Sequence, residues 1–329
     1  MLNAKPFDAP ASIESALRTV RTERAGVDAL AHALEKGLAS PFAKAVEFLS
    51  QAKGRVIVTG VGKSGHIGAK IAATLASTGT PAFFVHPAEA NHGDLGMIAR
   101  DDVVLAMSWS GESTELRGIV AYSRRFSIPL IAMTSSDSSS LGREADVVLT
   151  LPKADEACPH GLAPTTSTLM QLVLGDALAI ALLEARGFTR DNFRDFHPGG
   201  KLGATLTHLS EIMRSGEDMP AVPLGTTMPE AVMVLSNKKV GCVCVLGADG
   251  SLEGIITDGD VARNLHRNLK DIAVDEIMTR QPKTASPDMS AGAAIAYLNE
   301  NKIGALVVME GQKPVGIVHF HDLLRIGAA

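Results

Sequence analysis

The chain has 329 residues, which is more than one average domain and suggests two or three compact units. Its 31 Lys and Arg residues stand against 36 Asp and Glu, and the net charge of −5 argues against nucleic acid as the main partner. Apolar residues make up 46% of the chain and aromatic residues only 4%, so its cores must consist of Ala, Val, Leu, Ile and Met, as is typical of α/β proteins.

The cysteines and the apolar segments indicate a cellular compartment. Cys158, Cys242 and Cys244 form no Cys-x-x-Cys pair of a redox motif or a structural zinc site. The N-terminus lacks a basic start followed by an apolar run, as a secretory signal would have. The longest uncharged stretch, 157–175, contains two prolines and a Thr-Thr-Ser-Thr cluster that a membrane-spanning helix would not tolerate. We therefore expect a cytoplasmic protein without a membrane span.

The first two thirds of the chain predict a parallel α/β sheet. Residues 12–51 are expected to form two helices. Five short β-rich runs follow, separated by stretches long enough for one helix each: 55–59, 81–85, 103–107, 129–133 and 147–151. Apolar strands that alternate with helices indicate a parallel sheet covered on both faces. A long helix is expected from about residue 165 to 186, ending at Gly187.

The last third of the chain contains an internal repeat. The sequence EIMR at 211–214 recurs as EIMT at 276–279, and GIITDGDVAR at 254–263 recurs as GIVHFHDLLR at 316–325. These two diverged copies of about 60 residues resemble CBS (cystathionine-β-synthase) domains, and the resemblance covers 208–329. It implies two α+β copies that pair into one tandem module.

The first expected strand runs into a glycine-rich turn, GVGKSG at 60–65. This turn matches the G-x-G-x-x-G pattern of dinucleotide-binding folds, but the second strand ends at Val85-His86 without the acidic residue that would hold a ribose. A Walker A loop fails as well, because Ile57 stands where its first glycine is needed. The glycines and the unpaired N–H groups at the helix start near Ser64 favour a phosphate instead.

The third expected strand ends in a second hydroxyl-rich turn, SWSGEST. Ser108, Ser110, Ser113 and Thr114, with the amides at the next helix start, form a candidate phosphate cradle without arginine. The alternative is that these hydroxyls only cap the helix. Because both turns follow parallel strands, at the edge where α/β folds bind ligands, we favour a ligand site.

Several segments together resemble a sugar isomerase (SIS) domain: GVGKSGHIG, STGTPAFFVHPAEANHGDLG, SWSGES, ACPHGLAPTTST and HPGG. With the CBS pair, the chain from about residue 12 to 329 closely resembles the D-arabinose 5-phosphate isomerases. The resemblance implies an SIS-type α/β sandwich with a five-stranded parallel sheet flanked by helices. The expected parts are a helical arm (1–36), the SIS domain (37–204) and CBS copies at 208–271 and 275–329.

The resemblance also implies an activity. It predicts an aldose–ketose isomerase that interconverts D-ribulose 5-phosphate and D-arabinose 5-phosphate through a cis-enediol, feeding Kdo and lipopolysaccharide synthesis. It further predicts a homo-oligomer, for which we expect a tetramer, and no required cofactor. The alternatives are an isomerase of another phosphosugar and a non-catalytic sugar-phosphate sensor. Regulators with SIS domains usually contain a basic DNA-binding helix, and the N-terminal 50 residues show none.

Such an isomerase needs a base that moves the C1–C2 proton and a cation or donor that stabilises the enediolate. We assign Glu156, in the loop after the last strand, as the base, and Lys63 to the enediolate or the phosphate. Glu115 is expected to support or orient a catalytic group, and Glu112 is its competitor for that role. His197, held extended before a proline, is the candidate for ring opening or proton shuttling, with a structural capping role as the alternative.

The segment 86–94 gathers His, Glu and Asp, but two histidines six positions apart on a loop do not define a metal site. We expect His92 to bind a sugar hydroxyl and Gly79 and Thr80 to line the same pocket. By resemblance to relatives, His86 is expected in the substrate site and as the ligand of an adventitious, inhibitory zinc ion.

The CBS resemblance implies a second ligand site. In CBS pairs that bind adenosyl compounds, a hydroxyl and an aspartate of the Gly-Ile-x-Thr-x-x-Asp segment hold phosphate and ribose. The first copy keeps both, as Thr257 and Asp260, whereas the second keeps Asp322 and has His319 in place of the hydroxyl. We expect one site for a nucleotide or nucleotide-sugar effector, and the alternative is a purely structural dimerisation module.

Overall fold

The structure is a computed structural model that describes residues 7–197 and 199–328, without the side chain of Leu202. The chain divides between Phe193 and Arg194 into two compact units, which are described one at a time below. The first six residues of the expected helical arm, and the last residue of the second CBS copy, lie outside the described residues.

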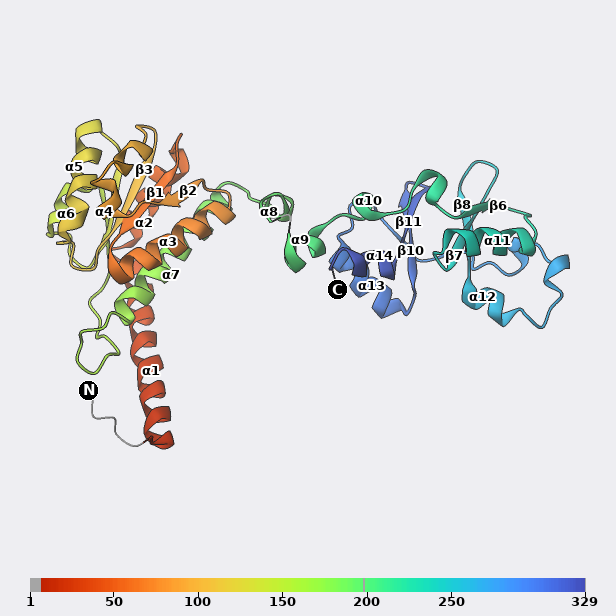
Figure 1. The fold of residues 1–329 in the computed structure, drawn as a ribbon, viewed down its shortest axis with the longest axis horizontal. Helices are drawn as coiled ribbons and strands as arrows, with labels where there is room; N and C mark the ends of the chain where they lie inside the picture. Colours follow the sequence, from red (N-terminus) through yellow and green to blue (C-terminus); the bar gives the residue numbers. More distant parts are fainter. Residues whose placement is uncertain (1–6, 198, 329) are drawn as a thin grey trace. The chain divides into compact units, whose positions relative to one another are not determined.

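Within the described residues, the first unit is built around a five-stranded parallel sheet of order β2-β1-β3-β4-β5 (Figure 1). Its strands are β1 (Val56–Gly60), β2 (Ala82–Phe84), β3 (Val103–Met107), β4 (Leu130–Thr134) and β5 (Val147–Thr150). The strands β1, β3 and β4 are buried along their whole length, because helices cover both faces. The predicted strands and the predicted α/β fold class are confirmed, with strand ends that differ by at most one residue.

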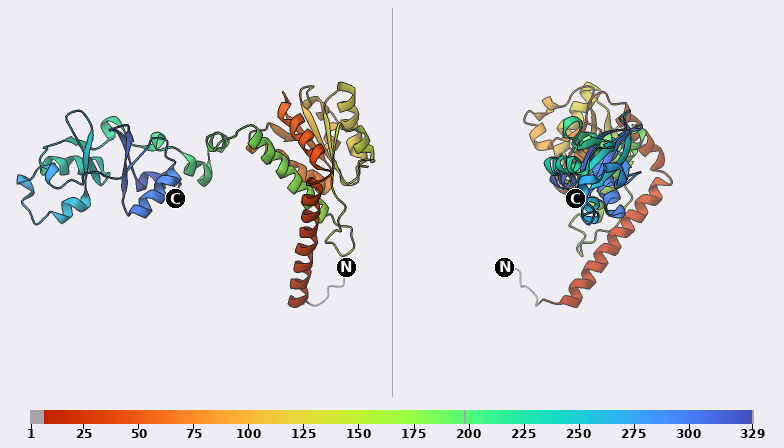
Figure 2. Two further views of the ribbon diagram at one scale, coloured as in Figure 1. Left: turned by 180° about the vertical axis from the view of Figure 1, so that it is seen from behind. Right: turned by 90° about the vertical axis from the view of Figure 1, so that its right-hand side faces the viewer.

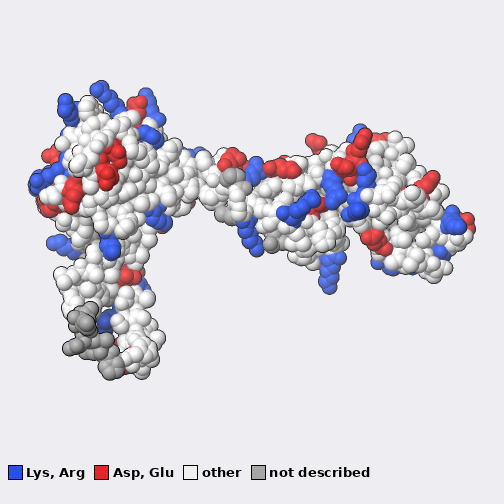
Figure 3. Space-filling view, in the orientation of Figure 1, with Lys and Arg blue, Asp and Glu red and all other residues white. Residues whose placement is uncertain are grey.

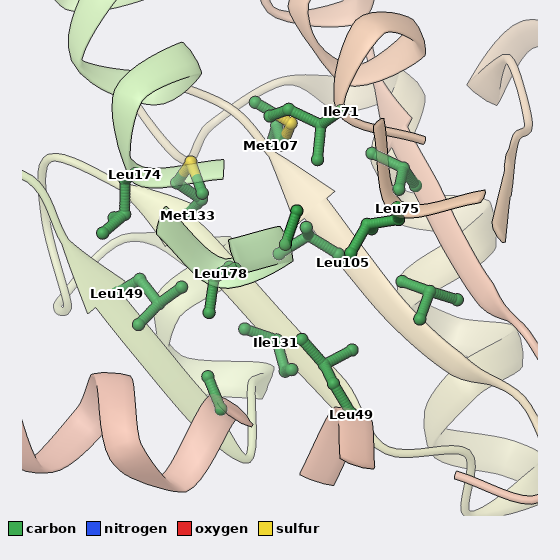
Figure 4. Packing of buried hydrophobic residues seen from close by; sticks show 14 of the residues in the cluster. Leu49, Ile71, Leu75, Leu105, Met107, Ile131, Met133, Leu149, Leu174 and Leu178 are labelled. Carbon is green, nitrogen blue, oxygen red and sulfur yellow. The ribbon is translucent and has the colours of Figure 1, made fainter. Parts of the chain in front are cut away.

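One face of the sheet packs against the long helices. These are α1 (Ala9–Leu34), α2 (Ala39–Gln51), α3 (Gly62–Ser77) and α7 (Thr166–Ala185). Figure 4 shows Leu105 and Ile131 of the sheet facing Leu49 of α2, Leu75 of α3 and Leu178 of α7. The helix α7 is long and apolar enough to cross a membrane by composition, but half of its most apolar window is buried inside this unit. The packing of α7 against α1, α2 and α3 in this core accounts for that apolar character.

Short helices cover the other face. They are α4 (Pro87–Ala90), α5 (Arg117–Phe126), α6 (Ser140–Glu144) and the 3-10 helices Asp94–Met97 and Thr114–Leu116. Ile57, Val104 and Ile119 belong to the core on this side, whereas Val56 and Val58 belong to the core under α7. This alternation along β1 is what a strand between two helical layers requires.

The N-terminal part of α1 extends away from the sheet (Figure 2). Near its C-terminal end α1 packs closely on α7, since a Cβ at Gly26 would collide with the Thr166 side chain. Further towards the N-terminus, Ile13, Leu17 and Val20 are exposed to 64, 49 and 63%. The first turns of this helix therefore present apolar side chains that the described part of this chain leaves exposed.

The second unit contains two copies of one β-α-β-β-α order, as the repeat predicts. The first copy consists of β6 (Ala221–Pro223), α11 (Met228–Lys238), β7 (Cys242–Leu246), β8 (Leu252–Thr257) and α12 (Asp258–Arg263). The second consists of β9 (Thr284–Ala285), α13 (Ala291–Asn301), β10 (Ala305–Glu310), β11 (Lys313–His319) and α14 (Phe320–Arg325). The other elements of this unit are α9 (Gly200–Leu206), α10 (Leu209–Ile212) and the 3-10 helices Gly216–Asp218, Leu269–Asp271 and Val274–Glu276, while α8 (Arg190–Phe196) spans the division between the two units.

The two copies exchange their leading segments. The backbone N–H of Arg214, before the first copy, donates to the Ile317 carbonyl of β11 at 2.9 Å, and that of Thr279 donates to the Ile255 carbonyl of β8 at 2.9 Å. Each copy is thus completed by the EIM segment that precedes the other, which gives the module an approximate two-fold symmetry.

A shared core lies between the two copies. Cys242, Cys244 and Ile255 of the first copy join Val307 and Ile317 of the second in one buried cluster. Burial raises the pKa of both thiols to about 12, so they remain protonated at neutral pH. The structure therefore places these cysteines in core packing, as their alternation along one strand predicts.

Candidate active site

The carboxyl edge of the sheet brings the predicted catalytic segments together. Lys63 follows β1, Ser108 follows β3 and Glu156 lies in the loop after β5, and all three line one cavity of about 380 Å³. The lining includes the predicted residues Lys63, Ser64, Ser108, Ser110, Ser113 and Glu156. This is the edge at which open α/β sheets bind their ligands.

The glycine-rich turn places Lys63 and Ser64 in the first turn of α3. Gly62 has a φ of +58°, which L side chains rarely adopt. A Cβ at Gly65 would lie 2.6 Å from the carbonyl oxygen of Gly60, so the helix start touches the end of β1 backbone to backbone. The glycines thus serve to hold α3 against β1, and the exposed Lys63 side chain stands at the mouth of the cavity.

The serine turn after β3 is held by its own hydroxyls. The Ser108 and Ser113 hydroxyl oxygens lie 2.8 Å apart, and the Gly111 N–H donates to the Ser108 hydroxyl at 3.1 Å. The Trp109 carbonyl accepts a hydrogen bond from the Ser135 hydroxyl at 2.8 Å, which ties the turn to the end of β4. The hydroxyls therefore shape the turn while three of them, including Ser110, line the cavity.

The predicted competitor Glu112 points elsewhere. Its carboxylate accepts hydrogen bonds from the Ser140 N–H at 2.8 Å and the Ser140 hydroxyl at 2.6 Å. These hydrogen bonds lower the pKa of Glu112, which therefore stays ionised and anchors the start of α6. A role of Glu112 in this cavity is corrected to a structural one.

Glu115 and Thr114 lie outside the residues that line the cavity. A helix follows the serine turn, as predicted, and its first turn is a 3-10 helix, Thr114–Leu116, that continues into α5. Both side chains are exposed, and the Thr114 hydroxyl donates to the Glu115 carboxylate at 3.4 Å. Within one chain, Thr114 is therefore not a cavity ligand, and the support that Glu115 gives to catalysis stays a prediction.

Glu156 both holds the start of α7 and presents its carboxylate to the cavity. Its Oε2 accepts hydrogen bonds from the Thr165 N–H at 2.7 Å, the Thr165 hydroxyl at 2.9 Å and the Ser167 N–H at 3.4 Å, which caps the start of α7. Burial raises the pKa of Glu156, but the hydrogen bonds from Ser167 and Thr165 outweigh it and leave the pKa below its ordinary value. An ionised carboxylate at neutral pH therefore faces the cavity.

Several lining residues were not assigned from the sequence. They are Ser167 and Thr168 at the start of α7, and Gly161, Leu162 and Pro164 in the loop that precedes α7. That loop runs from the end of β5 to Thr165 without regular secondary structure, and loops of this length in compact domains are usually functional. The ACPHGLAPTTST segment pointed to this loop but not to individual side chains.

His86 and His92 lie beyond the end of β2, at the same edge of the sheet but outside the lining residues of the cavity. The His86 Nδ1 accepts a hydrogen bond from the Ala88 N–H at 3.3 Å and so caps α4. Neither histidine lines the cavity of one chain, and their predicted contacts with the sugar stay a prediction.

The same cap limits the predicted zinc site. Because Nδ1 accepts the Ala88 N–H, the proton of the His86 ring lies on Nε2, and neither nitrogen offers a lone pair to a metal. Zinc sites in proteins also use three or four protein ligands. Residues 7–197 and 199–328 contain no group of three His, Cys, Asp or Glu side chains that could hold a metal ion. The described side chains therefore do not fit a zinc site at His86.

Gly79 and Thr80 lie at the opposite edge of the sheet, before β2. The Gly79 carbonyl accepts a hydrogen bond from Arg186 at 3.1 Å, at the far end of α7, and Phe188 packs against Gly79. Because α7 begins beside Glu156 and spans about 30 Å at 1.5 Å per residue, these residues are a full helix length from the cavity. The prediction that Gly79 and Thr80 line the pocket is wrong for a single chain.

His197 belongs to the second compact unit. It follows α8, is half-buried, and its N–H donates to the Arg194 carbonyl at 3.0 Å. Its role in proton transfer stays a prediction.

The second unit contains a cavity of about 470 Å³ to which both CBS copies contribute. The predicted residues Thr257 and Asp260 line it, and the Thr257 hydroxyl donates to the Asp260 carboxylate at 2.7 Å. Asp322 lies outside its lining, because its carboxylate accepts hydrogen bonds from Arg214 at 3.1 Å and Arg325 at 3.2 Å. The effector role predicted for Asp322 is therefore corrected to an internal ion pair.

Comparisons with known proteins match both parts of the chain. Residues 48–181 match the SIS domain, and residues 209–267 and 274–329 match the CBS domain. Arabinose 5-phosphate isomerase KdsD of Pseudomonas aeruginosa is 50% identical over 319 residues, which cover 96% of this chain and 97% of the relative. The enzyme of the same name in Escherichia coli K12 is 43% identical over 90% of this chain and 92% of its own length.

A solved structure of Escherichia coli CFT073 c3406 in complex with arabinose 5-phosphate is also similar to this chain. It has a TM-score of 0.55 and 42% sequence identity, and the match covers 58% of this chain and 100% of that chain.

Proposed function

Because this chain belongs to the arabinose 5-phosphate isomerase family, we propose that it interconverts D-ribulose 5-phosphate and D-arabinose 5-phosphate for Kdo and lipopolysaccharide biosynthesis. The observation that supports this most directly is the cavity at the carboxyl edge of the sheet. It combines an ammonium group, several hydroxyls and an ionised carboxylate. These groups suit a phosphosugar that exchanges a proton between neighbouring carbons.

The phosphate is proposed to bind where α3 and the serine turn meet the cavity. Ser64, Ser108 and Ser110 present hydroxyls there, and the N-terminus of α3 adds partial positive charge. Hydroxyl and amide donors bind a phosphate without a cluster of arginines, which agrees with the net charge of −5.

For the proton transfer, Glu156 is proposed as the base. It removes a proton from C1 of the ketose or from C2 of the aldose and returns it to the other carbon of the enediolate. Lys63, at the mouth of the same cavity, is placed to stabilise the negative charge that develops on the sugar oxygens. His86, His92, Glu115 and His197 remain proposed contributors whose contacts with the sugar require more than the cavity of one chain.

We propose that the protein works as a homo-oligomer, a tetramer. The exposed apolar residues Ile13, Leu17 and Val20 support this, because they repeat at helical spacing along one side of α1. On the face seen in Figure 3, the projecting part of α1 is mostly free of charged side chains. A helical stretch without tertiary packing has little stability in water, so a partner on this face would stabilise it.

The proposed reaction needs no cofactor, because a carboxylate and an ammonium group supply the base and the charge stabilisation. A cytoplasmic location is proposed as well. Cys158, Cys242 and Cys244 are free thiols in this structure, which suits a reducing compartment.

A nucleotide or nucleotide sugar is proposed as an effector at the cavity of the CBS pair. Asp260 and Thr257 offer acceptors for hydroxyl groups, and Lys302 and Lys283 offer positive charge for a phosphate. A volume of about 470 Å³ suits a small-molecule ligand.

Purified protein mixed with D-ribulose 5-phosphate in the presence of EDTA tests the main proposal. We expect D-arabinose 5-phosphate to form at an enzymatic rate, with a plateau at the same ratio from either sugar. Binding of the sugar without turnover would favour the sensor. Turnover of a different phosphosugar alone would favour the other isomerase, and either result would overturn the proposal.

A further inference from the structure

The CBS module contains two equivalent places for a ligand, one at the start of α12 and one at the start of α14, and corresponding residues of the two copies surround them. Thr257 and Asp260 form a capping box at the start of α12, and His319 and Asp322 form one at the start of α14. In both copies an arginine three residues further along the helix donates to the aspartate. The two places can therefore be compared position by position.

At the first place the matched positions carry small side chains. Thr279, delivered by the exchanged segment, lines the cavity together with Asp258 and Gly259. Asp260 is almost fully buried beside them, with 6% exposure, and its described ion pair is with the exposed Arg263 of its own helix. This place is therefore open to a ligand that reaches the Asp260 and Thr257 side chains.

At the second place the matched positions carry larger side chains. Arg214 stands where the first place has a threonine, and Phe320 and His321 stand where it has aspartate and glycine. The Arg214 guanidinium donates to both carboxylate oxygens of Asp322, at 3.1 and 3.4 Å, and to the Lys238 carbonyl at 3.2 Å. The cation thus joins the aspartate of the second copy to the end of α11 in the first copy.

Burial explains why this contact persists. Asp322 is 4% exposed, and a buried carboxylate without a counter-charge is unfavourable. Arg214 and the exposed Arg325 both supply that counter-charge from inside the chain, and Arg214 is the one without a counterpart at the first place. A ligand at the second place would have to displace a bidentate ion pair before it could reach the aspartate.

We propose that the CBS pair is a receptor with one working site, in which Arg214 occupies the second place as an internal cation and leaves the Thr257–Asp260 cavity to the ligand. This inference rests on the effector proposed above and specifies its stoichiometry. The ligand takes hydroxyl groups to Asp260 and Asp258 and an anionic group to Lys302, so a ribonucleotide fits the chemistry.

Isothermal titration of the full-length protein with AMP, ADP and ATP tests the proposal. We expect one of them to bind with one site per chain. Asp260→Asn should weaken that binding by tenfold or more, whereas Asp322→Asn at the equivalent position should leave it within about twofold. Thr279→Arg copies the internal cation into the open place and should abolish binding, whereas Thr279→Ser should preserve it.

Four results would each overturn the proposal that the CBS pair has one working site. These results are two sites per chain, equal losses in the two aspartate variants, normal binding by Thr279→Arg, or no binding of any of the three nucleotides to the unmodified protein. If Asp322→Asn fails to fold, the stoichiometry of the unmodified protein and the Thr279 pair still decide. Sugar turnover is measured in the same samples, so that turnover without nucleotide binding overturns only this inference, and binding without turnover overturns only the isomerase.

Discussion

The Glu156 carboxylate accepts a hydrogen bond from the Thr165 N–H at 2.7 Å, so the residue proposed as the base also holds the first turn of α7. That turn carries Ser167 and Thr168 into the same cavity. The hydrogen bonds from Thr165 and Ser167 to this carboxylate therefore position the Glu156 side chain together with two lining hydroxyls. Any substitution of Glu156 has to be examined for both chemistry and local structure.

Glu156→Gln separates these two tasks, because the amide oxygen still accepts a hydrogen bond but the side chain no longer accepts the sugar proton. We expect kcat to fall by at least about 100-fold, as for loss of a general base, and the free energy of unfolding to fall by about 1 kcal/mol or less. Steady-state kinetics and urea unfolding measure the two effects.

Glu112→Gln is the matched control for that variant. Glu112 is also a carboxylate that binds the start of a helix, through Ser140, but it points away from the cavity. We expect its kcat to stay within a few-fold of the unmodified protein. Near-normal turnover in Glu156→Gln, or an equal loss in both variants, would remove Glu156 as the base.

The lowered pKa of Glu156 predicts how stability and rate depend on pH. The folded state favours its ionised form, so this contribution to stability is present above the ordinary pKa of 4.5 and is lost as the pH falls through the folded pKa. The difference in unfolding free energy between the unmodified protein and Glu156→Gln should therefore shrink in acid. Glu156 should also give kcat/KM an acid limb below 4.5. If Glu156→Gln instead removes an acid limb near pH 6–7, the lowered pKa assigned to Glu156 is contradicted.

The sheet and part of the candidate site could be predicted from the sequence, and the reasons are physical. Strands buried on both faces are apolar throughout, so their runs could be recognised, and strand direction put Lys63, Ser108 and Glu156 at one edge. The same rule places Gly79 and Thr80, which precede β2, at the other edge. In a single chain these two residues therefore lie away from the cavity to which the motif resemblance assigned them.

Other features depend on long-range contacts that have no local signal. The Glu112 carboxylate is committed to Ser140, which lies 28 positions further along the chain. Arg214 reaches Asp322 across 108 positions. Both partners were visible as charged or polar residues in the sequence, but the choice between a ligand and an internal partner needed the folded geometry.

Ser108→Ala tests the proposed phosphate site. Its hydroxyl lines the cavity and lies 2.8 Å from the Ser113 hydroxyl, so its loss removes a donor and loosens the turn. A hydrogen bond to a charged group contributes about 1.5–3 kcal/mol, so KM for D-arabinose 5-phosphate should rise roughly 10- to 100-fold. Ser136→Ala, which removes a hydroxyl paired with Ser138 outside the cavity, should leave KM unchanged. An unchanged KM in Ser108→Ala would place the phosphate elsewhere.

Gly65→Ala tests the contact between α3 and β1. The added Cβ would lie 2.6 Å from the Gly60 carbonyl oxygen, so the helix start has to move. We expect a loss of about 1–3 kcal/mol in unfolding free energy, together with lower turnover because Lys63 moves with the helix. At Gly37 an added Cβ has no neighbour within 4 Å among the described residues, so Gly37→Ala should leave both quantities nearly unchanged. Equal stability of the two variants would show that the close approach is not needed.

Leu17→Glu tests whether the apolar side of α1 binds another subunit. Leu17 is 49% exposed and lies between Ile13 and Val20 on the projecting part of the helix, so a charge there costs little in an isolated chain but opposes burial in an interface. Light scattering after size exclusion should show a smaller assembly than the proposed tetramer. Ser12→Glu adds the same charge at an exposed position of the same helix, away from the Ile13–Val20 side, and should keep the assembly intact. If Leu17→Glu keeps the mass of the unmodified protein, subunits associate through another surface. If its turnover falls with its mass, the active site requires the neighbouring subunit.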